Sequence, residues 1–154
     1  MKDFLLEKRL SSDAVIDKLS IDKSERELSV YSKGKLLKTY SISLGKEPIG
    51  DKQFEGDNKT PEGLYFINGK NSQSSYYKNL GISYPNSEDR NEAKKLSKSA
   101  GGDIKIHGLP NKLPFLGRLH RITDWTAGCV AVTNEEMDEL FNTVKMGTPI
   151  EIKP

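Results

Sequence analysis

The chain has 154 residues, the size of a single domain, with 34% hydrophobic and 30% charged residues. Its net charge of only +2, with both signs mixed along the chain, argues against a dedicated nucleic-acid-binding protein. No stretch approaches the roughly 18 consecutive apolar residues of a membrane-spanning helix, and a single cysteine excludes a disulfide within the chain.

The first thirteen residues differ from the rest. They combine mixed charge with a short apolar cluster, Phe4-Leu5-Leu6, which predicts an N-terminal tail or short helix over 1–13 and a folded domain over 14–154. This start lacks the long apolar core and small-residue cleavage site of a signal peptide. The chain is therefore expected to be either cytoplasmic or the mature or trimmed form of an exported protein.

Three strand-like segments follow. Ile16 to Ile21, the alternating Leu28 to Tyr31 and the segment Leu36 to Leu44 are separated by polar turns, the second of which contains Gly34. Three consecutive strands predict an antiparallel meander, and an all-β beginning argues against a doubly wound α/β fold.

A long loop, Gly45 to Gly63, comes next and is rich in glycine and proline. Loops of this length in compact domains are often functional, although turn formation alone would also explain the composition. A strand, Leu64 to Ile67, and a polar loop, Asn68 to Ser75, are expected after it. The segment Tyr76 to Pro85 then holds three tyrosines, whose commoner role is core packing.

Two helices are predicted. The first covers Ser87 to Leu96, with Ser87 as its cap and acidic residues preceding basic ones along the helix. The second follows a capping box formed by Thr133 and Glu136, carries apolar residues at helical spacing and is expected to end at Gly147. A last strand is expected over 149–152.

The candidate catalytic residues lie in two segments. Asp103 to Gly108 is a strand-like run that ends on His107, and Thr126 to Val132 contains Cys129, expected at the mouth of a strand. A thiol and a histidine in such positions can act as nucleophile and base in acyl transfer. The amides of Gly128 and Cys129 are candidate oxyanion donors. A buried structural thiol and a satisfied core histidine are the alternative interpretations.

These residues resemble a known family. His107-Gly108 followed by Thr126-Ala127-Gly128-Cys129 is similar to the HG and S/T-x-G-C motifs of the L,D-transpeptidase (YkuD-like) catalytic domain. The resemblance extends to Gly50–Gly63 and Gly147–Ile152, and covers roughly residues 14–154. It implies a mainly β domain with a few helices, sandwich-like or barrel-like in form.

The resemblance also implies a reaction. Cys129 would be the nucleophile and His107 the base, with the Gly108 carbonyl orienting the imidazole. The substrate would be a peptidoglycan stem peptide, whose acyl group passes through a Cys129 thioester with release of D-alanine. The acceptor would be another stem or a peptidoglycan-attached protein. No cofactor and no metal are expected, and the location would be the periplasm or cell wall.

Two positions depart from the family pattern. Many members carry histidine where this chain has Ala127 and arginine where it has Ala131. The segment between the motifs offers replacements, of which Arg118 and Arg121 would bind carboxylates by charge-assisted bonds. In the family the segment that holds Tyr84 borders the cleft, which makes Tyr84 the candidate for a substrate-facing ring, and Thr126 matches the Ser/Thr position. The expected substrate-binding residues are thus Thr126, Arg118, Arg121, Tyr84, Trp125 and His120.

Three alternatives accompany this interpretation. The same Cys–His pair would make a hydrolase if water were the acceptor, cutting a stem crosslink or a protein–peptidoglycan link. A catalytically silent wall-binding module would need neither residue. A zinc centre of Cys129, His107 and His120 is disfavoured, because no CxxC or HExxH pattern occurs. The sequence leaves the acceptor and the oligomeric state open.

Overall fold

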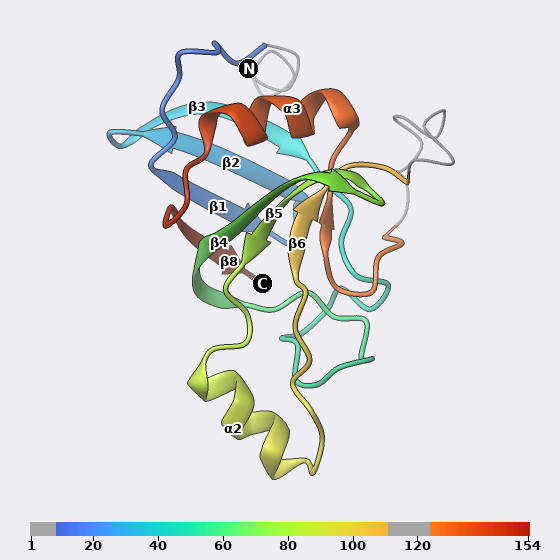
Figure 1. The fold of residues 1–154 in the computed structure, drawn as a ribbon. Coiled ribbons are helices and arrows are strands. Elements are labelled where there is room, and N and C mark those ends of the chain that lie inside the picture. Colours follow the sequence, from blue (N-terminus) through green and yellow to red (C-terminus); the bar gives the residue numbers. More distant parts are fainter. Residues whose placement is uncertain (1–8, 111–123) are drawn as a thin grey trace.

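The computed structural model describes residues 9–110 and 124–154 (Figure 1). Strands dominate these ranges, and two helices accompany them. In chain order the elements are β1 (Lys18–Asp22), β2 (Glu27–Ser32), β3 (Lys35–Ser41), β4 (Gly63–Ser74), β5 (Tyr77–Ile82), α2 (Ser87–Lys95), β6 (Lys105–His107), β7 (Val130–Ala131), α3 (Asn134–Thr143) and β8 (Pro149–Lys153).

The strands form one curved sheet in the order β3-β2-β1-β8-β4-β5-β6-β7. Neighbouring strands are antiparallel except for the parallel pairs β1–β8 and β6–β7. Two bridges, Ser43 with Ala131 and Gly45 with Thr126, join the segment after β3 to β7 and the residues before it. The two edges of the sheet therefore meet, which gives the mainly β, barrel-like form that the sequence predicted.

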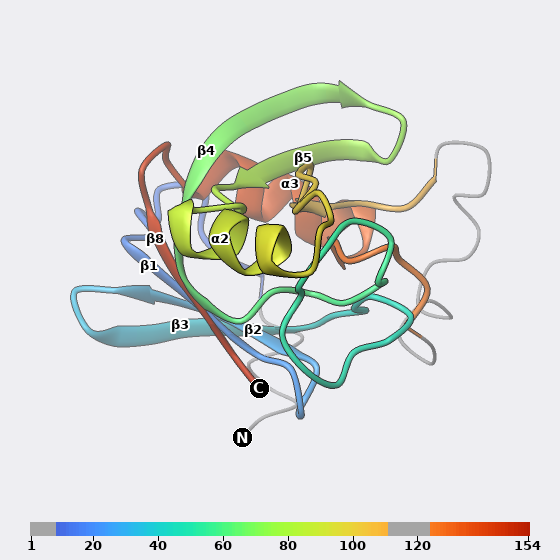
Figure 2. The ribbon, with the colours of Figure 1, turned by 90° about the horizontal axis from the view of Figure 1, so that it is seen from below.

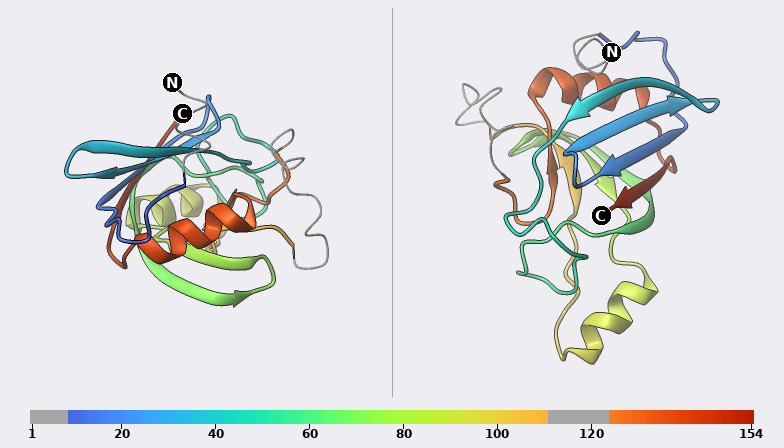
Figure 3. Two further views of the ribbon diagram at one scale, coloured as in Figure 1. Left: turned by 90° about the horizontal axis from the view of Figure 1, so that it is seen from above. Right: turned by 180° about the vertical axis from the view of Figure 1, so that it is seen from behind.

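The core lies inside this curve. Leu19 and Ile21 of β1 are fully buried, as are Met137 and Leu140 of α3. The helix lies across one end of the curved sheet, between the β1–β3 and β4–β5 strands (Figure 3). Helix α2 lies at the opposite end, well apart from α3 (Figure 1). In the view from below it stands in front of α3 (Figure 2). Neither described helix has the length and apolar character needed to cross a bilayer.

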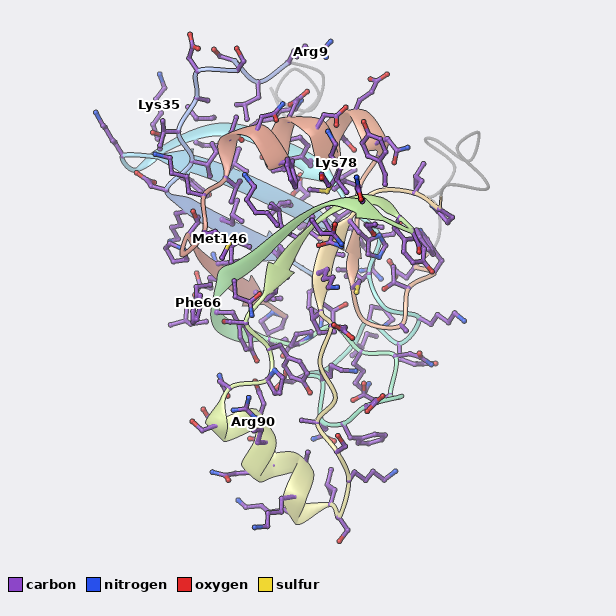
Figure 4. All side chains as sticks on the ribbon, viewed as in Figure 1. Arg9, Lys35, Phe66, Lys78, Arg90 and Met146 are labelled. Carbon is purple, nitrogen blue, oxygen red and sulfur yellow. The ribbon has the colours of Figure 1, made fainter. Side chains whose placement is uncertain are left out.

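Alternation along β4 gives this strand its two faces. Tyr65 and Ile67 are buried, whereas Leu64 and Phe66 are exposed. Phe66 projects outward at the same edge of the molecule as Met146 (Figure 4).

The predicted polar loop over 68–75 is wrong, because β4 continues to Ser74. It pairs with β5 through Lys70↔Leu80 and Asn71↔Asn79. Backbone ladder bonds, rather than burial of alternating apolar side chains, hold this outer part of the hairpin together. The sequence of this segment therefore has no alternation of apolar and polar residues that would predict a strand.

The helix boundaries also differ in detail. The cap of α2 is Asn86 rather than Ser87: its Oδ1 accepts from the Asp89 amide at 2.9 Å, and Asp89 Oδ2 accepts from the Asn86 amide at 3.0 Å. The Thr133–Glu136 capping box of α3 is confirmed. Helix α3 ends at Thr143, and Gly147 instead belongs to the turn into β8, where its amide donates to the Ile67 carbonyl at 2.7 Å.

The beginning of the domain is tied to α3. The Leu10 amide donates to Glu139 Oε1 at 3.2 Å, and residues 9–13 contain no helix or strand. Residues 1–8 lie outside the described part, so the tail or short helix expected over 1–13 stays a prediction.

Candidate active site

His107 ends β6, between β5 and β7, and is 6% exposed. Its Nδ1 lies 2.7 Å from the Gly108 carbonyl oxygen. A carbonyl can only accept, so Nδ1 carries the proton and Nε2 of the neutral ring has a free lone pair. Burial lowers the pKa of His107, and the nearby Lys105 charge lowers it further. The imidazole is thus oriented and neutral, as a general base requires, and the Gly108 carbonyl lies where the family resemblance implies.

Gly108 needs to be glycine at this position. A Cβ atom there would lie 2.5 Å from Asn134 Oδ1 and 3.1 Å from the Tyr76 carbonyl oxygen. The space is taken because the Gly108 amide donates to that Tyr76 carbonyl at 3.0 Å, while Asn134 Oδ1 accepts from the Leu109 amide. Close backbone packing therefore fixes the carbonyl that orients the imidazole.

Cys129 immediately precedes β7, as predicted for a residue at the mouth of a strand. The register Ile106↔Val130 places Lys105 opposite it on β6. The thiol is partly buried and donates to the Asp103 carbonyl at 3.2 Å. Burial raises the pKa of Cys129, and the Lys105 backbone and charge offset part of that rise. The resting thiol is therefore neutral, with its proton directed to Asp103 rather than to the imidazole.

Thr126 organises the turn that leads into Cys129. Its hydroxyl donates to the Cys129 carbonyl at 2.6 Å and accepts from the Gly128 amide at 3.1 Å. Both bonds lie inside the turn. Thr126 also lines the cavity described below, so its contact with substrate stays a prediction. The Gly128 amide is already bonded to Thr126, so the Cys129 amide is the more available of the two predicted oxyanion donors. The Cys129 amide donates to no described residue.

Gly128 connects this turn to the long loop. Its φ is +135°, and a Cβ atom would lie 2.7 Å from the Lys59 carbonyl oxygen. Both the backbone conformation and the contact require glycine. The backbone of loop 45–63 therefore packs directly against the cysteine turn at Gly128.

His107 and Cys129 open onto one cavity of about 670 Å³. Most of its lining residues are of polar type, and they come from the β4–β5 hairpin, β6, the segment after β3 and the segments around Cys129. Besides the cysteine and histidine, it consists of Lys46, Asn71, Gln73, Ser74, Ser75, Tyr76, Asn79, Asp103, Lys105, Trp125, Thr126 and Ala127. The cavity brings together residues from distant parts of the chain.

Two aromatic rings flank the imidazole. The Tyr76 ring centroid lies 4.6 Å from that of His107, and the Trp125 centroid lies 5.7 Å from it. Trp125 Nε1 is buried and has no hydrogen-bond partner in the described ranges. Trp125 thus borders the cavity, and its contact with substrate stays a prediction. Tyr76 was missed, because three tyrosines of this segment look alike in the sequence.

The prediction for Tyr84 is corrected. Tyr84 is 4% exposed, its hydroxyl donates to the Ala100 carbonyl at 2.8 Å, and its ring packs edge-on against Tyr65. Proline at position 85 makes the backbone extended but does not decide which way the ring points. The ring points into the core, so Tyr84 is not part of the cavity lining.

The segment between the two motifs is described only at residues 109–110 and from Asp124 onward. Arg118, His120 and Arg121 lie outside the described residues, so their contact with substrate remains a prediction. Asp124, from the same segment, pairs with Arg26 at 2.8 Å and accepts from the Leu44 amide. No cluster of three metal-ligating side chains occurs over 9–110 and 124–154. Because His120 is not among these residues, the zinc alternative is untested.

Comparisons with known proteins identify the family of the chain. The model of the L,D-transpeptidase catalytic domain (YkuD) matches residues 17–152. Escherichia coli YafK, named provisionally as an L,D-transpeptidase, is 33% identical over 132 residues, which cover 82% of this chain and 46% of YafK.

Solved structures give the same result. The helical cell shape determining protein Pgp2 from Campylobacter jejuni aligns with a TM-score of 0.67 and 28% identity, covering 100% of this chain and 56% of Pgp2. Bd1075 from Bdellovibrio bacteriovorus aligns with a TM-score of 0.63 and 30% identity, covering 96% of this chain and 51% of Bd1075. L,D-transpeptidases of known structure share the fold. The chain spans about half the length of YafK, Pgp2 and Bd1075.

Proposed function

The chain belongs to the L,D-transpeptidase catalytic domain family, and from that premise we propose that it is a cysteine acyltransferase acting on peptidoglycan stem peptides. The observation that carries the proposal is the shared cavity of Cys129 and His107, in which the Gly108 carbonyl leaves imidazole Nε2 free as a base. Cys129 is the nucleophile, His107 the base and Gly108 the residue that orients it.

Acylation begins from a neutral pair. When a donor peptide enters, the thiol leaves the Asp103 carbonyl and passes its proton to His107 Nε2 as Sγ attacks the peptide carbonyl carbon. The separation of charge is delayed until attack, because burial disfavours both the thiolate and the imidazolium. Hydrogen bonds between catalytic groups commonly tighten only in the substrate complex.

The tetrahedral intermediate carries a negative oxygen. The Cys129 amide is the donor we assign to it, since this N–H is unused in the described residues whereas the Gly128 amide is bonded to Thr126. Collapse breaks the carbon–nitrogen bond, and the imidazolium returns its proton to the leaving amine. A Cys129 thioester and a free amino acid, D-alanine for a tetrapeptide stem, result.

The second half reverses the roles. An acceptor amine loses a proton to His107 Nε2, attacks the thioester and restores the thiol. Another stem peptide or a peptidoglycan-attached protein would supply the amine. We place this chemistry outside the cytoplasm, where the family generally works, and propose a role in cell shape like the one for which Pgp2 is named.

Hydrolysis is the second candidate, with water as the acceptor. The small, exposed Ala127 next to the cysteine turn favours it, because a short side chain there leaves water free access to the thioester. The same dyad would then cut a stem crosslink or a protein–peptidoglycan link. The cavity geometry is compatible with either acceptor.

A purified disaccharide-tetrapeptide, incubated with the protein and read by mass spectrometry, tests the proposal. Crosslinked dimers with released D-alanine would establish transpeptidation, whereas release without dimers would indicate hydrolysis. Cys129→Ala and His107→Gln should abolish both, and Lys95→Gln on α2 is the matched surface control. No release from tetrapeptide, crosslinked or protein-linked peptidoglycan would favour a silent wall-binding module.

A further inference from the structure

Two lysines stand on opposite sides of the cysteine strand. Lys105 lies on β6, two residues before His107, and faces Cys129 across the parallel β6–β7 pair. In a strand, residues two positions apart share a face, so Lys105 and His107 project to the same side. Both lysines line the cavity that contains Cys129.

Lys46 approaches from the other side. It follows Gly45, which bridges Thr126, and its amide donates to the Thr126 carbonyl at 2.9 Å. Its side chain is exposed, and no described carboxylate pairs with its ammonium group. The cysteine turn is thus enclosed between a lysine from the segment after β3 and a lysine from β6.

Neither ammonium group is firmly neutralised. Lys105 Nζ lies 3.7 Å from Asp103 Oδ1, but the Asp103 side chain is 95% exposed, so this contact is weak and easily replaced. Asp103 is also the sole acidic residue in the described lining. The cavity therefore presents an excess of positive charge beside the thiol, which attracts anionic ligands.

Position 131 cannot supply this charge. Ala131 shares the strand face of Cys129, yet it is fully buried, and its backbone bonds in both directions to Ser43. Charge recognition in this cavity must come from its walls, and the two lysines are the cations that the described walls contain.

We propose that Lys46 and Lys105 bind two carboxylates of the acyl donor, one on each side of the scissile bond, and so select anionic stem peptides. One carboxylate is that of the leaving residue, and the other belongs to the side chain of the residue that donates the acyl group. This inference rests on the proposed function and names the donor that the site selects. Charge-assisted hydrogen bonds from ammonium to carboxylate are the recognition chemistry.

Lys105 has a second effect that the experiment must separate. Its charge lowers the pKa of both Cys129 and His107. Loss of Lys105 would therefore alter the reactivity of the thiol even without substrate. Alkylation by iodoacetamide, which is uncharged, measures that effect alone.

The test compares three disaccharide-tetrapeptide donors: one with free carboxylates, one amidated at the C-terminus and one amidated on the side chain of the acyl-donating residue. The proteins are wild type, Lys46→Gln, Lys105→Gln and the surface control Lys95→Gln. Release of the terminal residue gives kcat/KM. Each cavity variant should lower kcat/KM for the free-acid donor by about tenfold to a hundredfold, after correction for iodoacetamide reactivity.

Each cavity variant should also become indifferent to one of the two amidations, since the carboxylate it bound is then absent. The control should match wild type throughout. Equal use of all three donors by wild type, or unchanged kcat/KM in both variants, would overturn this inference and leave the proposed function intact. No release by wild type from any donor would overturn both.

Discussion

The ring of Tyr76 lies against the imidazole of His107, with 4.6 Å between the ring centroids and 32° between their planes. The same residue also accepts the Gly108 amide through its carbonyl. Tyr76 thus contacts both the imidazole of His107 and the backbone of Gly108, from the turn between β4 and β5.

Tyr76→Ala should lower kcat of the proposed reaction about three- to tenfold, because an aromatic contact of this kind contributes about 0.5–1.5 kcal/mol beyond its buried area. Tyr76→Phe keeps the ring and should retain near wild-type kcat. Steady-state release of D-alanine measures both. The melting temperature should change little, since Tyr76 is 40% exposed. Equal activity of the alanine variant would remove Tyr76 from any positioning role.

Thr126→Val should disrupt the cysteine turn. Valine has the shape of threonine but loses the bonds to the Cys129 carbonyl and the Gly128 amide. Leaving buried groups unsatisfied costs about 1–3 kcal/mol, so the urea midpoint should fall by the corresponding amount. Turnover should fall as well. Thr126→Ser, which keeps the hydroxyl, is the control, and indistinguishable behaviour of the two variants would contradict this account of the turn.

The pH dependence follows from burial of the pair. The pKa of His107 is lowered, so it should stay neutral at pH values where a free histidine is already charged. Turnover should therefore persist below about pH 6.5, the ordinary histidine value, and fall only as pH drops through the lowered pKa. The pKa of Cys129 is raised, so alkylation without substrate should increase only above the pH range of a free thiol.

The same shifts give signs for stability. Below the ordinary histidine pKa, the unfolded chain binds a proton that buried His107 does not, so acid lowers the free energy of unfolding. Above the ordinary thiol pKa, the unfolded chain loses a proton that Cys129 retains in the folded chain, so high pH also lowers the free energy of unfolding. Denaturant titrations of wild type, His107→Gln and Cys129→Ala over pH should isolate each contribution. For the thiol, alkylation of the folded protein should begin at a higher pH than alkylation of the unfolded chain.

Tyr84→Phe separates stability from activity. The variant loses the hydrogen bond to the buried Ala100 carbonyl and should be less stable by about 1 kcal/mol. Because the ring lies in the core and outside the cavity lining, kcat/KM should be unchanged at a temperature where the variant remains folded. A selective rise in KM would restore the prediction that Tyr84 faces substrate.

The sequence carried the signals for strands whose two faces differ. Leu19 and Ile21, or Tyr65 and Ile67, alternate with polar or exposed residues because one face packs on the core. The outer half of β4 lacks that contrast, since hydrogen bonds to β5 hold it there and both faces remain largely exposed. The meander and the Thr133 cap were accordingly predictable, and the extension of β4 to Ser74 was not.

The candidate site could be predicted where the proposed chemistry needs a residue type that is rare in this chain. A single cysteine and a histidine followed by glycine are easily recognised in the sequence. The Gly108 carbonyl lies against the imidazole, as the family resemblance implies. The cavity walls do not stand out. Tyr76 and Tyr84 are equivalent by composition, and only the position of the hairpin turn decides which ring reaches His107. Likewise, the competition of Thr126 for the Gly128 amide depends on a local hydrogen bond that residue type does not reveal.

The bridges of Ser43 to Ala131 and Gly45 to Thr126 join the first third of the chain to the residues around Cys129. Contacts between such distant residues carry a large loop-closure entropy and form late when a chain folds. The environment of the thiol should therefore mature at the end of folding rather than with the first meander. Protection of Cys129 against alkylation would then report the completion of folding, and a partly folded chain would lack the environment that the proposed nucleophile needs.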